Sequence, residues 1–405
     1  MSDTYKLKMK QKHKEKLNKP AIRTLDISSF ILGISAALIL YLESDYFKTA
    51  TKSENVTVFF IVAYAITIAL IFNWHRLVRR FGKKNVFLGN LLAKALVVLM
   101  LANLSIGKVG IVFLMGYIIL TVLSWIDLDI LLEACSRDRK TGRIRGAYLT
   151  IMNAGYLVAP FFAGLILNKY GFQPVFLAAA LLILAVWLIC FFRLRNIDGS
   201  QIKGVDFMNL LRKLSGRKNV LRIYYVSFLL EFFYALMIIY TPLYLLDLGF
   251  SWADIGKIFT VMLLPFVLLQ YPVGYLADKK FEERDMIIFS LILMALSTLA
   301  IFFLSSKSVV LWALILFCTR IGASLIEILR DSYFYKRIDC RDVDIINFFR
   351  SVRPMAYIIG LLIATPVVYF LEIRFIFPLI SVGVLTGIFA AKNMASSRIP
   401  PLNKH

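Results

Sequence analysis

The chain has 405 residues, of which 60% are hydrophobic and 18% charged, and its mean hydropathy is +0.75. Soluble domains contain about 45–50% apolar and about 25% charged residues, so this surplus of apolar residues is too large for a packed core. The composition excludes soluble enzymes, nucleic-acid-binding proteins and disordered chains, although the net charge is +22. It predicts an all-α polytopic membrane protein.

Twelve apolar segments are long enough to cross a bilayer, for which a helix needs roughly 20 mostly apolar residues. We expect the spans at about 25–44, 55–73, 85–104, 109–133, 146–168, 172–192, 221–246, 252–276, 285–305, 308–331, 343–370 and 375–391. The longest polar stretch, 193–220, separates the first six spans from the other six. This spacing predicts two six-helix bundles, 25–192 and 221–391, related by pseudo-symmetry, as in transporters with internal repeats.

The basic residues are distributed unevenly between the two predicted membrane faces. Most of the 47 Lys and Arg lie in the tails 1–24 and 392–405, in the linker 193–220 and in the loops after even-numbered helices. The positive-inside rule makes this face cytoplasmic, with both termini inside. Within the linker, residues 205–214 have the apolar spacing of an amphipathic helix on the inner leaflet. We expect an integral cell-membrane protein, in a bacterial inner membrane, whose basic N-terminal tail contacts anionic membrane lipids.

Cysteine and histidine residues form no pattern that indicates a metal site or a disulfide framework. Cys135 and Cys340 lie at helix ends, while Cys190 and Cys318 lie inside apolar segments. The three histidines lie in the tails and a loop. We therefore expect no metal and no cofactor, and the charged first 24 residues predict no cleavable signal peptide.

Related basic motifs follow the second and the eighth predicted helix. The residues of the two motifs are Arg79, Arg80, Gly82, Lys83 and Lys84 in the first, and Gly274, Asp278 and Lys279 in the second. Both resemble the G-x-x-x-D-[RK]-x-G-[RK]-[RK] loop of the major facilitator superfamily, at the two positions where that family has it. The first copy departs from the family pattern because Arg79 replaces the acidic residue.

The fifth predicted helix carries a third motif, made of small residues around a proline. Its residues are Gly155, Ala159, Pro160, Ala163 and Gly164. They are similar to the G-x-x-x-G-P-x-x-G-G helix of the same family, and small residues let helix backbones approach closely. The resemblance extends over 25–391 and implies the major facilitator fold, with this helix at the interface between the halves.

The resemblance implies that the two basic loops are gate latches. The family's loop aspartate contacts a helix N-terminus in the other half, where the helix dipole favours an anion, and Asp278 is expected to do so. Arg79 cannot, and we expect it to pair with Asp342 or Asp344, or to be one more basic residue of the cytoplasmic face. Asp129 and Glu133 share a helix face, and the resemblance implies that they pair with Arg80.

Charged residues inside the predicted helices are candidates for proton coupling or substrate binding, because such residues are costly in a bilayer and face a cavity or a partner. The candidates are Asp127, Glu231, Arg320, Glu327 and Arg353. Glu231, near mid-depth, is expected to contact a proton or a cationic substrate, or else to pair with Arg320 or Arg353. Arg320 is then either an anchor for an anionic substrate group or the counter-ion of Glu231.

Glu327 and Lys94 are also charged residues that lie inside predicted helices. Glu327 lies seven residues after Arg320 on the same helix face, and is either a proton carrier or a partner of Arg330 or Lys279. Lys94, in the third helix, is expected to extend to a membrane interface.

These features predict a monomeric secondary active transporter that moves a small solute by alternating access, coupled to protons, with export favoured. Two alternatives are a facilitative uniporter and a transporter of lipids or lysolipids. A multi-pass membrane enzyme is disfavoured because the outward loops are short and no histidine stands beside an acid at a helix end. We therefore expect no enzymatic activity.

Overall fold

The computed structural model describes residues 19–53, 55–135, 141–194, 216–270, 272–273, 282–335 and 348–395, without the side chains of Glu133, 141–146 and Tyr335. The described residues form helices and connecting turns and no strand. The helices of the first half are α2 Lys19–Leu40, α3 Glu43–Thr51, α4 Thr57–Phe81, α5 Lys83–Asn103, α6 Lys108–Cys135, α7 Thr141–Tyr170 and α8 Phe172–Arg193. Those of the second half are α10 Lys218–Asp247, α11 Trp252–Leu268, α13 Glu283–Phe302, α14 Val309–Tyr335, α16 Val352–Phe370, the short η1 Ile373–Phe375, α17 Ile376–Leu385 and α18 Gly387–Lys392.

The expected number of membrane-spanning helices agrees with the structure. Within the described ranges, 11 helical segments are long and apolar enough to cross a membrane, with α2 and α3 counted together and η1, α17 and α18 forming the last. The apolar helix α11, of 17 residues, makes the twelfth span. The all-α polytopic fold is therefore confirmed.

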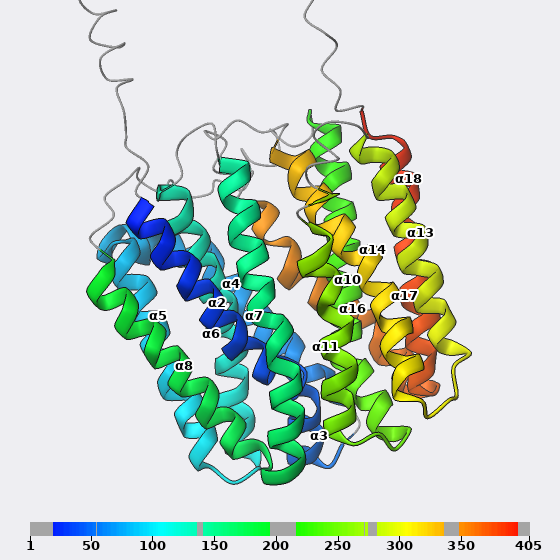
Figure 1. Cartoon of the computed structure of the whole chain (residues 1–405), viewed down its shortest axis with the longest axis horizontal. Helices are drawn as coiled ribbons and strands as arrows, with labels where there is room; N and C mark the ends of the chain where they lie inside the picture. The colour runs from blue at the N-terminus through cyan, green and yellow to red at the C-terminus, as the bar shows by residue number, and fades with distance from the viewer. Residues whose placement is uncertain are drawn as a thin grey trace, which may run out of the picture.

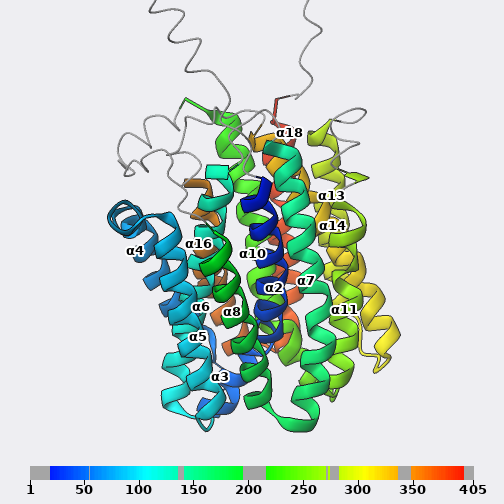
Figure 2. The same cartoon turned by 60° about the vertical axis from the view of Figure 1, so that its left-hand side comes forward.

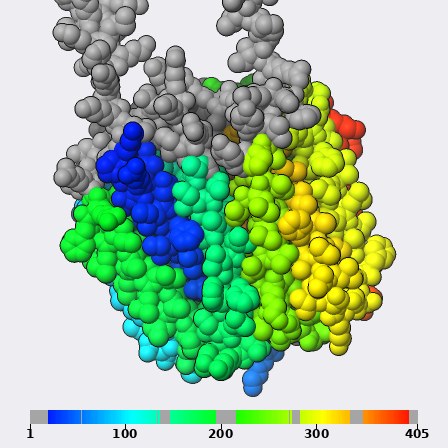
Figure 3. All heavy atoms as spheres, viewed as in Figure 1, coloured from blue at the N-terminus to red at the C-terminus, as the bar shows by residue number. Residues whose placement is uncertain are grey.

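The spans form two groups that follow the order of the chain. Helices α2 to α8 lie on one side of the molecule and α10 to α18 on the other (Figure 1). In the first group α2 packs against α7 and α8, and in the second α13 packs against α14 and α17. The groups meet where α7 contacts α11 and α4 contacts α16. Helices α7 and α11 lie side by side in the turned view (Figure 2), and their atoms meet on the face seen in Figure 3. We call the groups the first and second half.

The two membrane faces can be defined by the ends of the described chain. Helix α2 begins and α18 ends at one face, which we call the terminal face, and α3 lies at the opposite face (Figure 1). The core of each half is made of apolar side chains, with large apolar residues also exposed on the outer surface. Apolar side chains are expected on the outer surface of a protein that is surrounded by lipid.

Several helices differ in extent from the expected spans. The first span was expected at 25–44, but α2 begins at Lys19 and, after a turn at Tyr41 and Leu42, α3 continues the span to Thr51. Helix α4 continues to Phe81 instead of ending near residue 73, so Arg79 and Arg80 of the first basic motif lie in its last turn. Hydropathy locates only the part of a helix inside the lipid, whereas backbone hydrogen bonding continues into the polar interface.

Other predictions fall outside the described residues. The N-terminal tail up to residue 18, the expected amphipathic segment 205–214 and residues 396–405 are among them.

Candidate functional site

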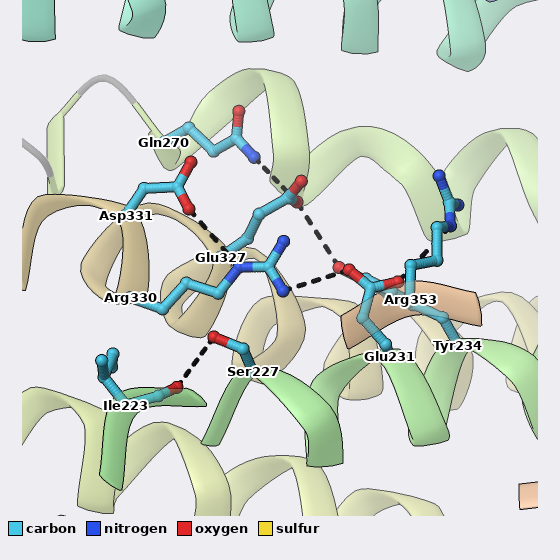
Figure 4. A network of polar contacts seen from close by, with 9 residues as sticks. All are labelled: Ile223, Ser227, Glu231, Tyr234, Gln270, Glu327, Arg330, Asp331 and Arg353. Carbon is cyan, nitrogen blue, oxygen red and sulfur yellow. Dashed lines mark hydrogen bonds and ion pairs between the residues drawn. The ribbon is translucent and has the colours of Figure 1, made fainter. Parts of the chain in front are cut away.

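Glu231 is the centre of a buried ion-pair cluster in the second half. It projects from α10, and its Oε1 lies 3.1 Å from Nη1 of Arg330 on α14. Its Oε2 lies 3.5 Å from Nε of Arg353 on α16, and Arg330 in turn lies 3.6 Å from Asp331 (Figure 4). One carboxylate therefore joins three helices. Of the two partners considered from the sequence, Arg353 is in contact, and Arg330 is an additional partner.

Glu327 lies beside this cluster, but its contacts differ in kind. Its Oε2 accepts hydrogen bonds from the Tyr234 hydroxyl at 3.4 Å and from Gln270 Nε2 at 3.2 Å (Figure 4). Gln270 accepts a 3.1 Å hydrogen bond from Asn153 on α7 of the first half. Glu327 is thus held by two neutral donors, and this hydrogen-bonded chain connects the two halves inside the membrane.

Arg320 occupies the middle of α14 and is 2% exposed. Its guanidinium lies over the rings of Phe233 and Tyr234, at 4.9 and 5.5 Å from their centroids. Its Nε and Nη1 are buried and have no hydrogen-bond partner. Among the residues that the structure describes, no carboxylate lies within 4 Å of it, so it is not the counter-ion of Glu231.

A second group of buried charges lies in the first half, and it includes a residue that the sequence reasoning missed. Glu43 is 6% exposed at the start of α3, where it is subject to the charges of Lys94 and Arg353. Lys94 is 1% exposed, with its Nζ 5.2 Å from the Tyr117 ring centroid. The expectation that Lys94 extends to an interface is wrong, because its side chain points into the bundle. The only sequence signal for Glu43 was the aromatic pair Tyr46 and Phe47, which follows it by one helical turn.

Asp127 belongs to neither cluster. It lies on α6, where its carboxylate accepts hydrogen bonds from Trp74 Nε1 at 2.6 Å and Asn90 Nδ2 at 3.0 Å. These donors come from α4 and α5, so the carboxylate joins three helices of the first half. This arrangement favours a structural role over a place in the central cavity.

The fifth-span motif occupies the seam between the halves. A Cβ at Gly155 would clash with the Phe30 carbonyl of α2, whereas a Cβ at Gly164 would clash with the Trp252 carbonyl of α11. A Cβ at Gly256 on α11 would lie 2.6 Å from the carbonyl oxygen of Pro160. Ala159 and Ala163 are buried in the same helix. Small residues on both sides of α7 therefore permit its close packing against both halves.

The expected latch residues are only partly described. Gly82 adopts a φ of +83° in the turn between α4 and α5, a conformation that favours glycine. Arg79 is exposed, Lys83 is half-buried, Lys84 donates a hydrogen bond to the Phe191 carbonyl and Arg80 lies over the Phe81 ring. Residues Gly274, Asp278, Lys279, Asp342 and Asp344 and the side chain of Glu133 lie outside the described residues.

Asp129 contacts the second half at the terminal face. Its Oδ2 lies 3.8 Å from Nε of Arg350, which precedes α16. The resemblance implied a pairing with Arg80, and the structure shows this cross-half contact of the same carboxylate.

Further polar contacts join the halves near the opposite face. Lys48 Nζ lies 3.1 Å from Asp247 Oδ1, and Trp252 Nε1 donates to Asp45 at 3.2 Å. Deeper along the seam the rings of Tyr64 and Tyr357 lie 4.4 Å apart. The described side chains include no cluster of three or more His, Cys, Asp or Glu that could hold a metal ion.

Comparisons with known proteins agree with this architecture. The sequence profile described as Major Facilitator Superfamily matches residues 25–339. A solved structure described as the human organic anion transporter MFSD10 (TETRAN) is similar in fold, with a TM-score of 0.65 over 93% of this chain and 100% of that chain, at 14% sequence identity. The sequence matches none of the curated proteins. Because the family profile covers most of the chain, this protein belongs to the major facilitator superfamily and is a multi-pass membrane transporter.

Proposed function

We propose that this transporter is secondary active, moving a small solute by alternating access in exchange for protons, with export as its direction. The observation that carries the proposal is the polar chain Asn153–Gln270–Glu327, which connects the two halves inside the membrane beside the Glu231 ion pairs. Ionisable groups at this depth are costly and typically mark substrate or proton pathways. A movement of the halves relative to each other would break or re-form these hydrogen bonds. The protonation state of Glu327 is thereby linked to the relative position of the two halves.

Glu327 is the better candidate for the proton carrier. Protonation of Glu231 would leave the mostly buried guanidinium of Arg330 and the half-buried guanidinium of Arg353 without its counter-charge, which is unfavourable in an apolar environment. Glu327 has only neutral hydrogen-bond donors within bonding distance among the described residues. Its protonation therefore breaks no ion pair. We assign proton exchange to Glu327 and the joining of α10, α14 and α16 to Glu231.

The test is proton flux out of proteoliposomes that contain the full-length protein and a trapped pH-sensitive dye, because solute added outside enters in exchange for internal protons. Pools of metabolites, organic anions and amphiphilic cations are added to wild type, Glu327→Gln and Glu231→Gln. Glutamine at position 327 keeps an oxygen that accepts from Tyr234 and Gln270 but cannot exchange a proton. A matched control is Glu372→Gln, because Glu372 is 68% exposed and pairs with Arg374 beyond the end of α16.

We expect a solute-evoked proton flux in wild type and in Glu372→Gln, and its loss in Glu327→Gln. A proton flux that is lost only in Glu231→Gln would indicate that Glu231, and not Glu327, carries the proton. Solute uptake without proton flux in wild type would contradict proton coupling and indicate a facilitative uniporter. Export is tested in inverted vesicles, where an acidic interior should drive solute accumulation and an alkaline interior should not.

A further inference from the structure

Arg320 differs from the other arginines of the spans 309–334 and 348–370 in having no acidic partner. Arg330 and Arg353 contact Glu231, and Arg350 contacts Asp129. Among the described residues, Arg320 has no carboxylate within 4 Å, although it lies at mid-span and is 2% exposed. A guanidinium at this depth is costly unless its charge is compensated.

Glu327 does not supply the missing counter-charge. It lies two turns along α14 from Arg320, and its oxygen is used by Tyr234 and Gln270. The Phe233 and Tyr234 rings under the guanidinium compensate part of its charge through cation–π contacts. They provide no acceptor in the plane of the N–H groups, so Nε and Nη1 stay unpaired.

The surroundings of Arg320 are aromatic and come from both halves. Tyr41, at the end of α2, is close enough to be subject to the charge of Arg320. Its ring lies 4.6 Å from that of Phe259 on α11, and the ring of Tyr234 lies 6.3 Å from Phe266 on the same helix. One unpaired guanidinium and several ring faces therefore occupy the same central region.

This combination fits one class of ligand. A planar guanidinium binds a carboxylate or phosphate through two parallel hydrogen bonds, which would satisfy the unpaired N–H groups. Aromatic faces bind a flat apolar body by stacking. Resting on the proposed transport function, we infer that Arg320 is the anchor for the anionic group of an aromatic organic anion, which binds between the two halves.

The test is equilibrium dialysis of 2-naphthoate against the full-length protein in detergent. Its uncharged analogue 2-naphthamide has the same ring system and lacks the anion. The variants are Arg320→Gln and Arg320→Lys. The lysine variant keeps the positive charge but cannot form the bidentate hydrogen bonds of a guanidinium. The matched control is Arg374→Gln, because Arg374 also lies over two rings, Phe302 and Phe375, but is exposed and paired with Glu372.

We expect wild type and Arg374→Gln to bind 2-naphthoate at least about tenfold more tightly than 2-naphthamide, as a charge-assisted hydrogen bond allows. Arg320→Gln should lose this preference, and Arg320→Lys should keep part of it. Thermal unfolding of Arg320→Gln should be no easier than that of wild type, since the variant removes an uncompensated charge. Equal binding of both probes, no binding of 2-naphthoate to wild type, or undiminished binding to Arg320→Gln would overturn the inference.

A second pair of probes distinguishes an anionic lipid from an aromatic anion as the ligand of Arg320. Anionic lysophosphatidylglycerol and zwitterionic lysophosphatidylcholine are compared in the same assay. Binding of lysophosphatidylglycerol through Arg320, without binding of 2-naphthoate, would contradict an aromatic ligand and indicate a lipid.

The failure of this inference is distinguishable from that of the proposed function. Arg320-dependent binding of 2-naphthoate without any transport would support the anion site and contradict transport of aromatic organic anions. Proton-coupled transport of another solute that persists in Arg320→Gln would support the function and reject the anion site.

Discussion

Buried charges in the membrane part of this protein differ in what compensates them. Glu231 has two arginines, while Asp127 has two neutral donors. The described residues place no opposite charge within 4 Å of Glu43 or Lys94, and Lys94 Nζ lies 5.2 Å from the Tyr117 ring centroid. Glu43 is subject to the longer-range fields of Arg353 and Lys94, and Lys94 is subject to that of Glu43. Because the charges of this pair are only weakly compensated, substitution of either residue can raise or lower the free energy of unfolding.

Glu43 and Lys94 should be energetically coupled. We expect Glu43→Gln and Lys94→Met each to change the free energy of unfolding, with the double variant deviating from additivity by about 0.5–3 kcal/mol, as interacting residues do. The physical reason is that each single variant leaves one buried charge without its only opposing field in the first half. Thermal unfolding of the four proteins in detergent measures the deviation. Additivity within about 0.5 kcal/mol would show that the two residues act independently.

The candidate charges could be located from sequence because a charged residue stands out within an apolar run. This holds for Glu231, Arg320, Glu327 and Arg353. Their partners could not be predicted, because the contacts join helices far apart in the chain, as between Glu231 and Arg330 or Asn153 and Gln270. Glu43 was missed for another reason. It lies at the end of an apolar run, next to the expected end of the first span at about residue 44, although α3 continues the helical span beyond it.

At the level of elements, α7 and α11 make the closest contact between the halves. The two helices meet at Gly164 and Gly256, where a side chain on either residue would clash with the backbone of the other helix. Polar residues of α7 and of the segment after α11, Asn153 and Gln270, meet farther along the same seam. The position of α7 at the interface follows from its small residues, which the sequence motif already contained.

Alanine substitution at this crossing should destabilise the closed seam. We expect Gly256→Ala to lower the free energy of unfolding by about 1–3 kcal/mol, since overpacking forces the backbones apart. The matched control is Gly89→Ala in α5, where a Cβ has no heavy atom within 4 Å and alanine favours the helix. Thermal unfolding in detergent measures both. A Gly256→Ala protein as stable as Gly89→Ala would mean that the crossing tolerates a wider separation.

The helices themselves were largely predictable, and their ends less so. Continuous apolar runs of sufficient length located all twelve spans. The junction of α17 and α18 at Thr386 carries no proline or charge, and hydropathy passes over it. The turn at Tyr41 and Leu42 contains two apolar residues, so hydropathy does not separate α2 from α3 there. The extension of α4 to Phe81 was missed because its last turns are polar and lie beyond the apolar run.

At the scale of the whole molecule, polar contacts join the halves near both faces. Lys48 pairs with Asp247 near the opposite face, where the side chains are 26% and 45% exposed. Asp129 contacts Arg350 near the terminal face. Alternating access requires that such contacts form and break in turn, so each should be weak. Partly exposed ion pairs contribute about 0–1 kcal/mol, which suits a contact of this kind.

Reversing the charge of Asp247 should favour separation of the two halves at the opposite face. We expect Asp247→Lys to raise the alkylation rate of a cysteine placed at Ile255, which is buried between α2 and α11, by about fivefold or less. The swapped pair Lys48→Asp with Asp247→Lys should restore the slow rate. As control, Lys257→Gln breaks a pair of the same length inside α11 and should leave the rate unchanged. A swapped pair that reacts as fast as the single variant would exclude an ion-pair effect.

The division into two halves was predictable because the apolar spans fall into two sets of six around a long polar linker. How the halves pack was not, because the packing depends on side chains from both halves that meet only in the folded molecule. Tyr64 with Tyr357 and Lys48 with Asp247 are contacts of this kind.

Alternating access requires that the two halves open at one face and then at the other. Electron–electron double resonance on spin-labelled protein in lipid nanodiscs tests it most directly. With the native cysteines replaced by alanine, one label pair at Ser53 and Lys307 reports on the opposite face. A second pair at Asn85 and Lys392 reports on the terminal face, and all four positions are exposed.

We predict that changing pH or adding a transported solute moves the two distances in opposite directions, with the opposite-face pair separating as the terminal-face pair approaches. Distances that stay constant, or that lengthen together at both faces under every condition, would contradict alternating access in this protein.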